Sequence, residues 1–281
     1  MEKVKGIGLP FDVNYSSCSS RKPRTFEWTT SASKYEVYID NAIELGLQSA
    51  LHPNKYGWLC ESMGECPTIR LKVIENLPKY KEKFRSIFTC EYDLLIDPFF
   101  KYSPPGSNLP WTHDQDAAVF EKTKICSMIC SPKSYMPGQK LRLQVAKNLK
   151  DTIDLFGGAH GSPVMGSGLG PKGEWWRSKL PGLADYRFSV VFENAVYDKY
   201  YTEKITDCFA TGTVPIYYGT RKISDDFNSA GIIFWEDFKN LESLTTDLYN
   251  SMLGAVKDNF ERVKNLKSAD DQLFQKIQEF S

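Results

Sequence analysis

The amino-acid sequence predicts an α/β protein of two lobes, each built on a parallel β-sheet with helices on its faces. The length of 281 residues is enough for two domains of roughly 100–150 residues each. Short apolar runs alternate with helix-like segments, as in parallel sheets. A proline-rich stretch from Pro98 to Pro110 interrupts this alternation. We therefore expect an N-terminal domain of residues 1–118 and a C-terminal domain of residues 119–281.

The elements predicted for the first half are short. The expected strands are residues 3–13, 55–60 and 86–90. Residues 17–34 are rich in Ser, Thr, Arg and Lys, and are predicted to form a loop. Tyr35 to Leu47 carries apolar residues at helical spacing and ends beside Gly46, so a helix is predicted there. Ile69 to Phe84 is charged and helix-like, with a break at Pro78.

The second half has clearer boundaries. The expected strands are residues 124–130, 153–156, 188–192, 214–218 and 232–235. Helices are expected over residues 140–149 and 202–211, and over most of the chain from Leu241 onward. Residues 161–182 are rich in Gly and Pro and are predicted to form a long loop. Strands that alternate with helices in this way favour a parallel sheet.

Charge and cysteine content limit the classes of function. Lys+Arg and Asp+Glu both number 35, so no net basic field attracts nucleic acid or an anionic membrane. The seven cysteines are odd in number and form no C-x-x-C pair, which favours reduced thiols over a zinc site or disulfides. The N-terminus lacks the apolar stretch of a signal peptide, and no apolar run approaches the ~20 residues that span a bilayer. We predict a cytoplasmic protein with no bound metal, no nucleic-acid partner and no integral membrane segment.

The strongest functional signal lies between Phe188 and Gly219, where a strand, a polar loop, a helix and a second strand form one βαβ unit. Ligands of open parallel sheets bind beyond the carboxyl ends of the strands. The candidate residues at that position are Glu193, Asn194, Tyr200, Thr202, Glu203 and Lys204. Thr202 is a good N-cap, which puts Lys204 in the first helical turn, where the helix dipole disfavours a cation.

An anion held at this helix end would reverse the penalty on Lys204, and helix N-termini bind phosphate readily. Lys204 is therefore a candidate ligand of a diphosphate. Glu203 is a candidate acceptor of hydrogen bonds from ribose or sugar hydroxyl groups. The alternative is an ordinary Lys–Glu pair at the start of a surface helix, and these residues alone do not decide between the two.

The segment reads F-E-N, a short loop, Y-x-T-E-K, a helix and G-T-V-P-I-Y-Y-G, and it resembles the C-terminal signature of the α-1,3/4-fucosyltransferases. The likeness continues through Ile232-Ile233-Phe234. Upstream, Lys124 to Ile129, Pro137 to Arg142 and Ile153 to Gly157 resemble the start of the same lobe. The resemblance implies a family 10-like glycosyltransferase of bacterial or viral type. It also implies the GT-B fold, two Rossmann-like lobes with a cleft between them, with C-terminal helices that cross back onto the first lobe.

The resemblance also implies roles for single residues. Arg142 corresponds to an arginine that faces the donor diphosphate. The run Tyr56 to Ser62 is similar to a strand of the family that ends in a carboxylate, so Glu61 is the expected general base. Alternatives for the base are Glu65, Glu91 and Asp93. The implied reaction is an inverting sugar transfer without metal or cofactor, in which Arg142 and Lys204 stabilise the departing diphosphate.

The expected donor is GDP-fucose and the expected acceptor is an oligosaccharide or other glycan. UDP-xylose is a second possible donor, because xylose also lacks the exocyclic hydroxymethyl group. One rival function is a metal-dependent, single-lobe GT-A transferase with Asp114-Gln115-Asp116 as its D-x-D motif, since hard cations prefer carboxylate oxygens. The other is a non-catalytic glycan-binding protein that keeps the fold of a transferase.

Overall fold

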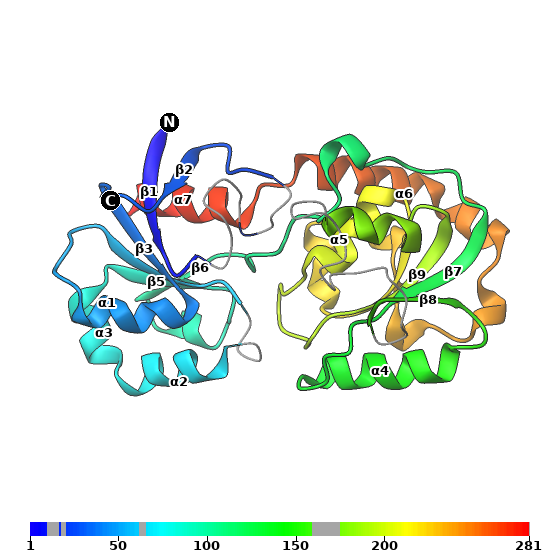
Figure 1. Ribbon diagram of the computed structural model, residues 1–281. Coiled ribbons are helices and arrows are strands. Elements are labelled where there is room, and N and C mark those ends of the chain that lie inside the picture. The colour runs from blue at the N-terminus through cyan, green and yellow to red at the C-terminus, as the bar shows by residue number, and fades with distance from the viewer. Residues whose placement is uncertain (10–16, 18–20, 62–65, 159–174, 281) are drawn as a thin grey trace. The chain divides into compact units, whose positions relative to one another are not determined.

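The computed structural model describes residues 1–9, 17, 21–61, 66–158 and 175–280. The chain divides into two compact units (Figure 1). Unit 1 consists of Met1–Asn108, Tyr197–Tyr200 and Lys267–Ser281, and unit 2 of Leu109–Val196 and Tyr201–Leu266. Each unit has its own parallel sheet and its own hydrophobic core.

Unit 1 is built on six strands in the order β2-β1-β3-β4-β5-β6, and every neighbouring pair is parallel. The strands are β1 (Glu2–Ile7), β2 (Phe26–Thr29), β3 (Tyr35–Ile39), β4 (Lys55–Leu59), β5 (Ser86–Thr89) and β6 (Phe100–Tyr102). The α-helices are α1 (Ile43–Gln48), α2 (Pro67–Glu75), α3 (Leu77–Lys83) and α7 (Ala269–Glu279). The break expected at Pro78 is confirmed, because α2 ends and α3 begins just before this residue.

Helices cover both faces of this sheet (Figure 1). α7 packs on one face, where the Phe274 ring lies 4.8 Å from Phe26 and 5.6 Å from Tyr35 between ring centroids. α1, α2 and α3 pack on the other face, where Tyr38 of β3 joins their buried residues. Because successive side chains of a strand point to opposite faces, β3 contributes to both cores. Unit 1 is therefore a three-layer α/β/α domain.

The helix expected over Tyr35 to Leu47 is wrong in its first half. Tyr35–Ile39 is the interior strand β3, and α-helical turns begin only at Ile43, after a 3₁₀ turn over Asp40–Ala42. A strand with both faces buried is apolar without alternation, so a short run of this kind fits a helix and a strand equally well. Residues 17–34, expected to be a loop, contain the edge strand β2. The strand expected over residues 3–13 ends at Ile7, and residues 10–16 lie outside the described part of the chain.

The last helix, α7, is part of unit 1, whereas the sequence placed residues 119–281 in one C-terminal domain. Asp270 accepts hydrogen bonds from the backbone nitrogen of Ser17 (3.1 Å) and from Trp28 Nε1 (2.8 Å). Asp271 accepts from the backbone nitrogens of Arg24 (2.8 Å) and Thr25 (2.9 Å). The chain thus returns to unit 1 after α6. The division between the units falls after Asn108, and the sequence placed it after residue 118.

Unit 2 is built on five parallel strands in the order β11-β10-β9-β7-β8. Its strands are β7 (Lys124–Ile129), β8 (Asp154–Phe156), β9 (Tyr186–Phe192), β10 (Val214–Tyr218) and β11 (Ile233–Phe234). Its α-helices are α4 (Pro137–Leu149), α5 (Glu203–Thr211) and α6 (Thr246–Asn265). The strands expected in this half are confirmed to within a residue or two at each end.

The two faces of the second sheet carry different helices (Figure 1). α4 packs through Val145 and Ala146 on the face that buries Phe188 and Val190 of β9. α5 packs on the opposite face with Val191. The carboxyl end of β9, the middle strand, is therefore bordered by a helix on each side.

Candidate functional site

The carboxyl end of β9 is where several of the predicted residues meet. Glu193 follows β9, and α5 begins at Glu203 with Thr202 in the N-cap position. The fully buried Glu193 carboxylate accepts hydrogen bonds from the backbone nitrogen of Thr202 (2.9 Å) and from Thr202 Oγ1 (2.7 Å). Thr202 was expected to cap α5 with its side chain, and this is wrong: its hydroxyl makes no capping hydrogen bond and donates to the strand end instead.

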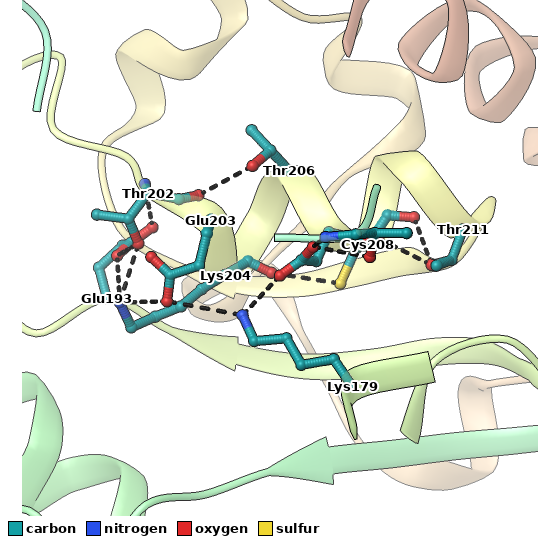
Figure 2. A network of polar contacts seen from close by, with 10 residues as sticks. Lys179, Glu193, Thr202, Glu203, Lys204, Thr206, Cys208 and Thr211 are labelled. Carbon is teal, nitrogen blue, oxygen red and sulfur yellow. Dashed lines mark hydrogen bonds and ion pairs between the residues drawn. The ribbon is translucent and has the colours of Figure 1, made fainter. Parts of the chain in front are cut away.

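Lys204 extends from the first turn of α5 toward the carboxylates of Glu193 and Glu203. Its Nζ lies 2.9 Å from Thr202 Oγ1, 3.4 Å from Glu203 Oε1 and 3.6 Å from Glu193 Oε2 (Figure 2). The Lys204 side chain keeps 22% of its surface exposed. The structure thus brings Glu193, Thr202, Glu203 and Lys204 together, and their binding of a donor stays a prediction.

A second lysine, Lys179, also contacts Glu203. It comes from the 3₁₀ helix η5 (Trp175–Gly182), within the stretch that was expected to be a loop. Its Nζ lies 2.5 Å from Asp207 Oδ2 and 3.6 Å from Glu203 Oε1, and its side chain is 5% exposed (Figure 2). No motif surrounds Lys179 in the sequence, and Asp207 reads as an ordinary polar position of a helix, so neither was singled out.

The pKa values of Glu193 and Glu203 are shifted in opposite directions. Burial raises the pKa of Glu193, and the nearby Lys204 only partly offsets that effect. Burial also acts to raise the pKa of Glu203, but Lys204, Lys179 and a hydrogen bond with Thr202 together outweigh it and leave the pKa of Glu203 below its usual value. Glu203 is therefore ionised at neutral pH, which suits an acceptor of hydrogen bonds from hydroxyl groups.

The first turn of α4 lies against the same strand end. The backbone nitrogen of Gly138 donates to the Asn194 carbonyl oxygen (2.9 Å). A Cβ at position 138 would stand 2.0 Å from the Glu193 carbonyl oxygen, so only glycine permits this approach. The Gln139 side chain accepts from the backbone nitrogens of Tyr135 and Met136 (both 3.1 Å) and thereby caps the helix.

Arg142 lies in α4 and is buried. One of its terminal nitrogens, Nη2, donates to Ser131 Oγ (2.8 Å). Its Nε is buried and has no hydrogen-bond partner among the described residues. An unpartnered N–H on a buried guanidinium is costly, and an anionic ligand would satisfy it.

Glu61 lies in unit 1, directly beyond the end of β4. Its backbone nitrogen and that of Cys60 donate to Asp40 Oδ1, at 3.3 and 3.0 Å. The Cys60 thiol contacts Asp40 Oδ2 at 2.9 Å. Asp40 has a backbone φ of 45°, which is unusual for a residue other than glycine. Asp40 was not predicted from the sequence, because it lies in the segment that was expected to be a helix.

Two alternatives for the base are held by a cation. Arg70 forms ion pairs with both Glu91 and Asp93. Both carboxylates are therefore engaged by one guanidinium group. The third alternative, Glu65, lies outside the described residues.

The remaining candidates are placed as follows. Tyr200 is buried in the segment Tyr197–Tyr200, which belongs to unit 1, whereas Asn194 belongs to unit 2. Asp114 and Asp116 form a 3₁₀ turn, with Asp114 exposed and Asp116 half-buried. The D-x-D motif of a metal-dependent GT-A transferase would directly follow a strand, and Asp114 and Asp116 do not.

Within the described ranges, no cluster of three or more His, Cys, Asp or Glu side chains is arranged to hold a metal ion. In the same ranges, no helix combines the length and the apolar character that crossing a membrane requires.

The fold and the site define an α/β protein with lysine, arginine and carboxylate side chains at the carboxyl edge of a parallel sheet, a usual place for a nucleotide ligand. The model of the C-terminal part of glycosyltransferase family 10 (fucosyltransferase) matches residues 119–263, slightly more than half of the chain. The chain belongs to glycosyltransferase family 10.

Relatives with assigned activities match parts of the chain. An α-(1,3)-fucosyltransferase of Helicobacter pylori is 38% identical over 66 residues, which are 24% of this chain and 14% of that protein. Mouse α-(1,3)-fucosyltransferase 7 is 34% identical over 171 residues, 53% of this chain and 38% of that protein. The matches thus span less than half the length of either relative. A crystal structure of an α1,3-fucosyltransferase aligns over 99% of this chain and 88% of its own with a TM-score of 0.49 and 15% identity.

Proposed function

We propose that this protein transfers L-fucose from GDP-fucose to a hydroxyl group of an oligosaccharide or other glycan. Its membership in the fucosyltransferase family and the activities named for its relatives support the proposal. The observation that carries it is the pair of cations, Arg142 and Lys204, on the two helices whose first turns meet the end of β9. Both helices also direct the positive ends of their dipoles toward that edge.

The two cations would bind the diphosphate of the donor. Arg142 has an unpartnered Nε among the described residues, and Lys204 is held by carboxylates from which a doubly charged diphosphate can draw it. As the bond between the anomeric carbon and the diphosphate breaks, negative charge develops on the departing oxygen. Cations fixed in a partly dry site stabilise that charge, so this mechanism needs no metal ion.

The other roles complete an inverting mechanism. Ionised Glu203 accepts hydrogen bonds from hydroxyl groups of the ribose or the fucose. The Glu61 carboxylate takes the proton of the acceptor hydroxyl, whose oxygen forms a bond to the anomeric carbon while GDP departs with the electron pair of the broken bond. UDP-xylose is the alternative donor, because its diphosphate would bind the same cations and its sugar also lacks a hydroxymethyl group. The cytoplasmic location stays a prediction.

The proposal is tested by isothermal titration calorimetry with GDP-fucose, UDP-xylose and UDP-glucose, with EDTA present throughout. We expect binding of GDP-fucose in EDTA, and at least a tenfold weaker affinity in Lys204→Ala, which is about 1.4 kcal/mol. Lys239→Ala, which removes an exposed lysine of the same unit, is the control and should bind as the wild type does. An unchanged affinity in Lys204→Ala would refute the diphosphate assignment. Binding only after addition of Mn²⁺ would instead support Asp114 and Asp116 as metal ligands.

A further inference from the structure

We propose that Lys179 is a positioning residue that holds the Glu203 carboxylate in place from the interior of unit 2 while the donor diphosphate engages Lys204. The inference rests on the proposed role of Glu203 as a ligand of the donor sugar or ribose. Lys179 is buried in unit 2 and is not itself proposed to contact the donor.

Lys179 is immobilised by its surroundings. Its Nζ is 2.5 Å from Asp207 Oδ2 and 3.6 Å from Glu203 Oε1, and it stands 4.0 Å from the centroid of the Trp111 ring. The side chain is 5% exposed. Carboxylates and aromatic faces compensate a buried ammonium group for its lost hydration, and Lys179 contacts both. Its position is therefore fixed by the fold rather than by solvent.

Asp207 is fixed in the same way. It is fully buried, and its Oδ1 accepts hydrogen bonds from the backbone nitrogen (2.8 Å) and hydroxyl (2.9 Å) of Thr112. Glu203 and Asp207 are four residues apart on α5 and so share one face of the helix. One ammonium group consequently spans both carboxylates, and the position of Lys179 determines where Glu203 can lie.

The two lysines that contact Glu203 differ in what they can do. Lys204 is 22% exposed and is shared with Glu193, so an incoming diphosphate can attract it. Lys179 is only 5% exposed and is paired with the buried Asp207 as well as with Glu203. When Lys204 turns to the diphosphate, Lys179 is the cation that continues to hold Glu203 as an oriented anion.

The charged groups around Glu203 set its titration. They are Lys179 from η5, Lys204 from α5 itself, Glu193 beyond β9, and Asp207 through Lys179. Both lysines lower the pKa of Glu203 against the effect of burial. Loss of Lys179 should therefore move the titration of Glu203 to higher pH, an effect that a residue with a merely structural role would not have.

The decisive comparison is between Asp207→Asn and the double variant Lys179→Met/Asp207→Asn. Lys179→Met alone would leave Asp207 as a buried unpaired charge and could fail to fold. In Asp207→Asn, the amide oxygen still accepts from Thr112, while the amide nitrogen replaces the oxygen that faced Lys179. Glu203 is then the carboxylate that remains beside Lys179. The double variant has the same asparagine but no cation, so the difference between the two isolates the action of Lys179 on Glu203.

Two measurements are made on both variants and on the wild type. Carboxyl-carbon NMR of the ligand-free protein gives the titration midpoint of Glu203, which we expect at higher pH in the double variant than in Asp207→Asn. Transfer kinetics should show a KM for GDP-fucose raised about tenfold in the double variant relative to Asp207→Asn, the size expected for a disturbed hydrogen bond to a charged group.

Equal midpoints in the two variants would overturn the proposal, as would equal KM values. If the wild type does not use GDP-fucose, the kinetic result refutes the proposed function, and the NMR titration still decides whether Lys179 holds Glu203.

Discussion

At the residue scale, Asp40 fixes the backbone of Glu61 at the end of β4. Its carboxylate accepts from the backbone nitrogens of Cys60 and Glu61, and its own backbone adopts a φ of 45°. Burial raises the pKa of Asp40, while hydrogen bonds from Cys60 and Glu61 act to lower it. A strained backbone that a side chain stabilises through hydrogen bonds often accompanies a functional position. Here the Asp40 carboxylate fixes the backbone of Glu61, the expected base.

Glu61→Gln tests that base. The substitution keeps the size of the side chain but removes its ability to take a proton, so kcat should fall by about 10²–10⁴ while the KM for GDP-fucose changes little. The measurement is steady-state transfer to a glycan acceptor. Asp93→Asn is the matched control, because Asp93 is exposed and paired with Arg70. The assignment would be wrong if Asp93→Asn lost activity and Glu61→Gln kept it.

At the scale of elements, α4 is positioned by the closeness of its first turn to the end of β9. A Cβ at position 138 would lie 2.0 Å from the Glu193 carbonyl oxygen and 2.8 Å from that of Asn194. These are backbone atoms just beyond β9, and they cannot move aside as a flexible side chain would. The register of α4, and with it the location of Arg142, therefore depends on one glycine.

Gly138→Ala should push α4 away from the strand, lower stability by about 1–3 kcal/mol and weaken nucleotide-sugar binding. Gly254→Ala is the control, because Gly254 lies in α6 and a Cβ added there would meet no atom within 4 Å among the described residues. That change should leave binding unaltered and stabilise the helix by roughly 0.5–1 kcal/mol. Urea unfolding and calorimetry with GDP-fucose provide the two readouts. Gly138→Ala with wild-type affinity would show that α4 does not contribute to the donor site.

At the scale of the whole molecule, the chain ends in the unit in which it begins. α7 packs on the sheet of unit 1, and Asp270 in the first turn of this helix accepts hydrogen bonds from Ser17. Burial raises the pKa of Asp270 to about 6, although hydrogen bonds from Ser17 and Trp28 oppose that shift. A carboxyl with a raised pKa in the folded state binds protons more tightly there than in the unfolded chain. Its contribution to stability is complete below the unfolded pKa and is lost as the pH rises through about 6.

Asp270→Asn should therefore alter how stability depends on pH. The wild type gains stability from Asp270 when the pH falls from 7.5 to 5.0, and the variant does not. The difference in unfolding free energy between the two proteins should be larger at pH 5.0 than at pH 7.5, by an amount on the order of 1 kcal/mol. Urea unfolding at the two pH values measures it. An equal difference in unfolding free energy at the two pH values would show that Asp270 does not titrate in this range.

Much of unit 2 could be predicted from the sequence, and less of unit 1. The strands of unit 2 are bounded by loops and glycines, and their apolar runs are short enough to exclude helices. β3 was mistaken for a helix because a central strand buried on both faces shows no alternation. The polar contacts that hold Thr202, Lys204 and Glu61 were not predicted, since each depends on a partner far along the chain or on a neighbouring element.

The sequence by itself determined the α/β class and the parallel sheet of unit 2, because both follow from the local pattern of apolar residues. It also determined the group of Glu193, Thr202, Glu203 and Lys204, because their motif is contained in one βαβ unit. Only the tertiary structure decided that Lys179 supports Glu203, that Asp40 holds the end of β4 and that α7 belongs to unit 1. Buried charges need partners, and the partners here come from segments that are distant in sequence. Such pairs are set by packing, which no local pattern of residues encodes.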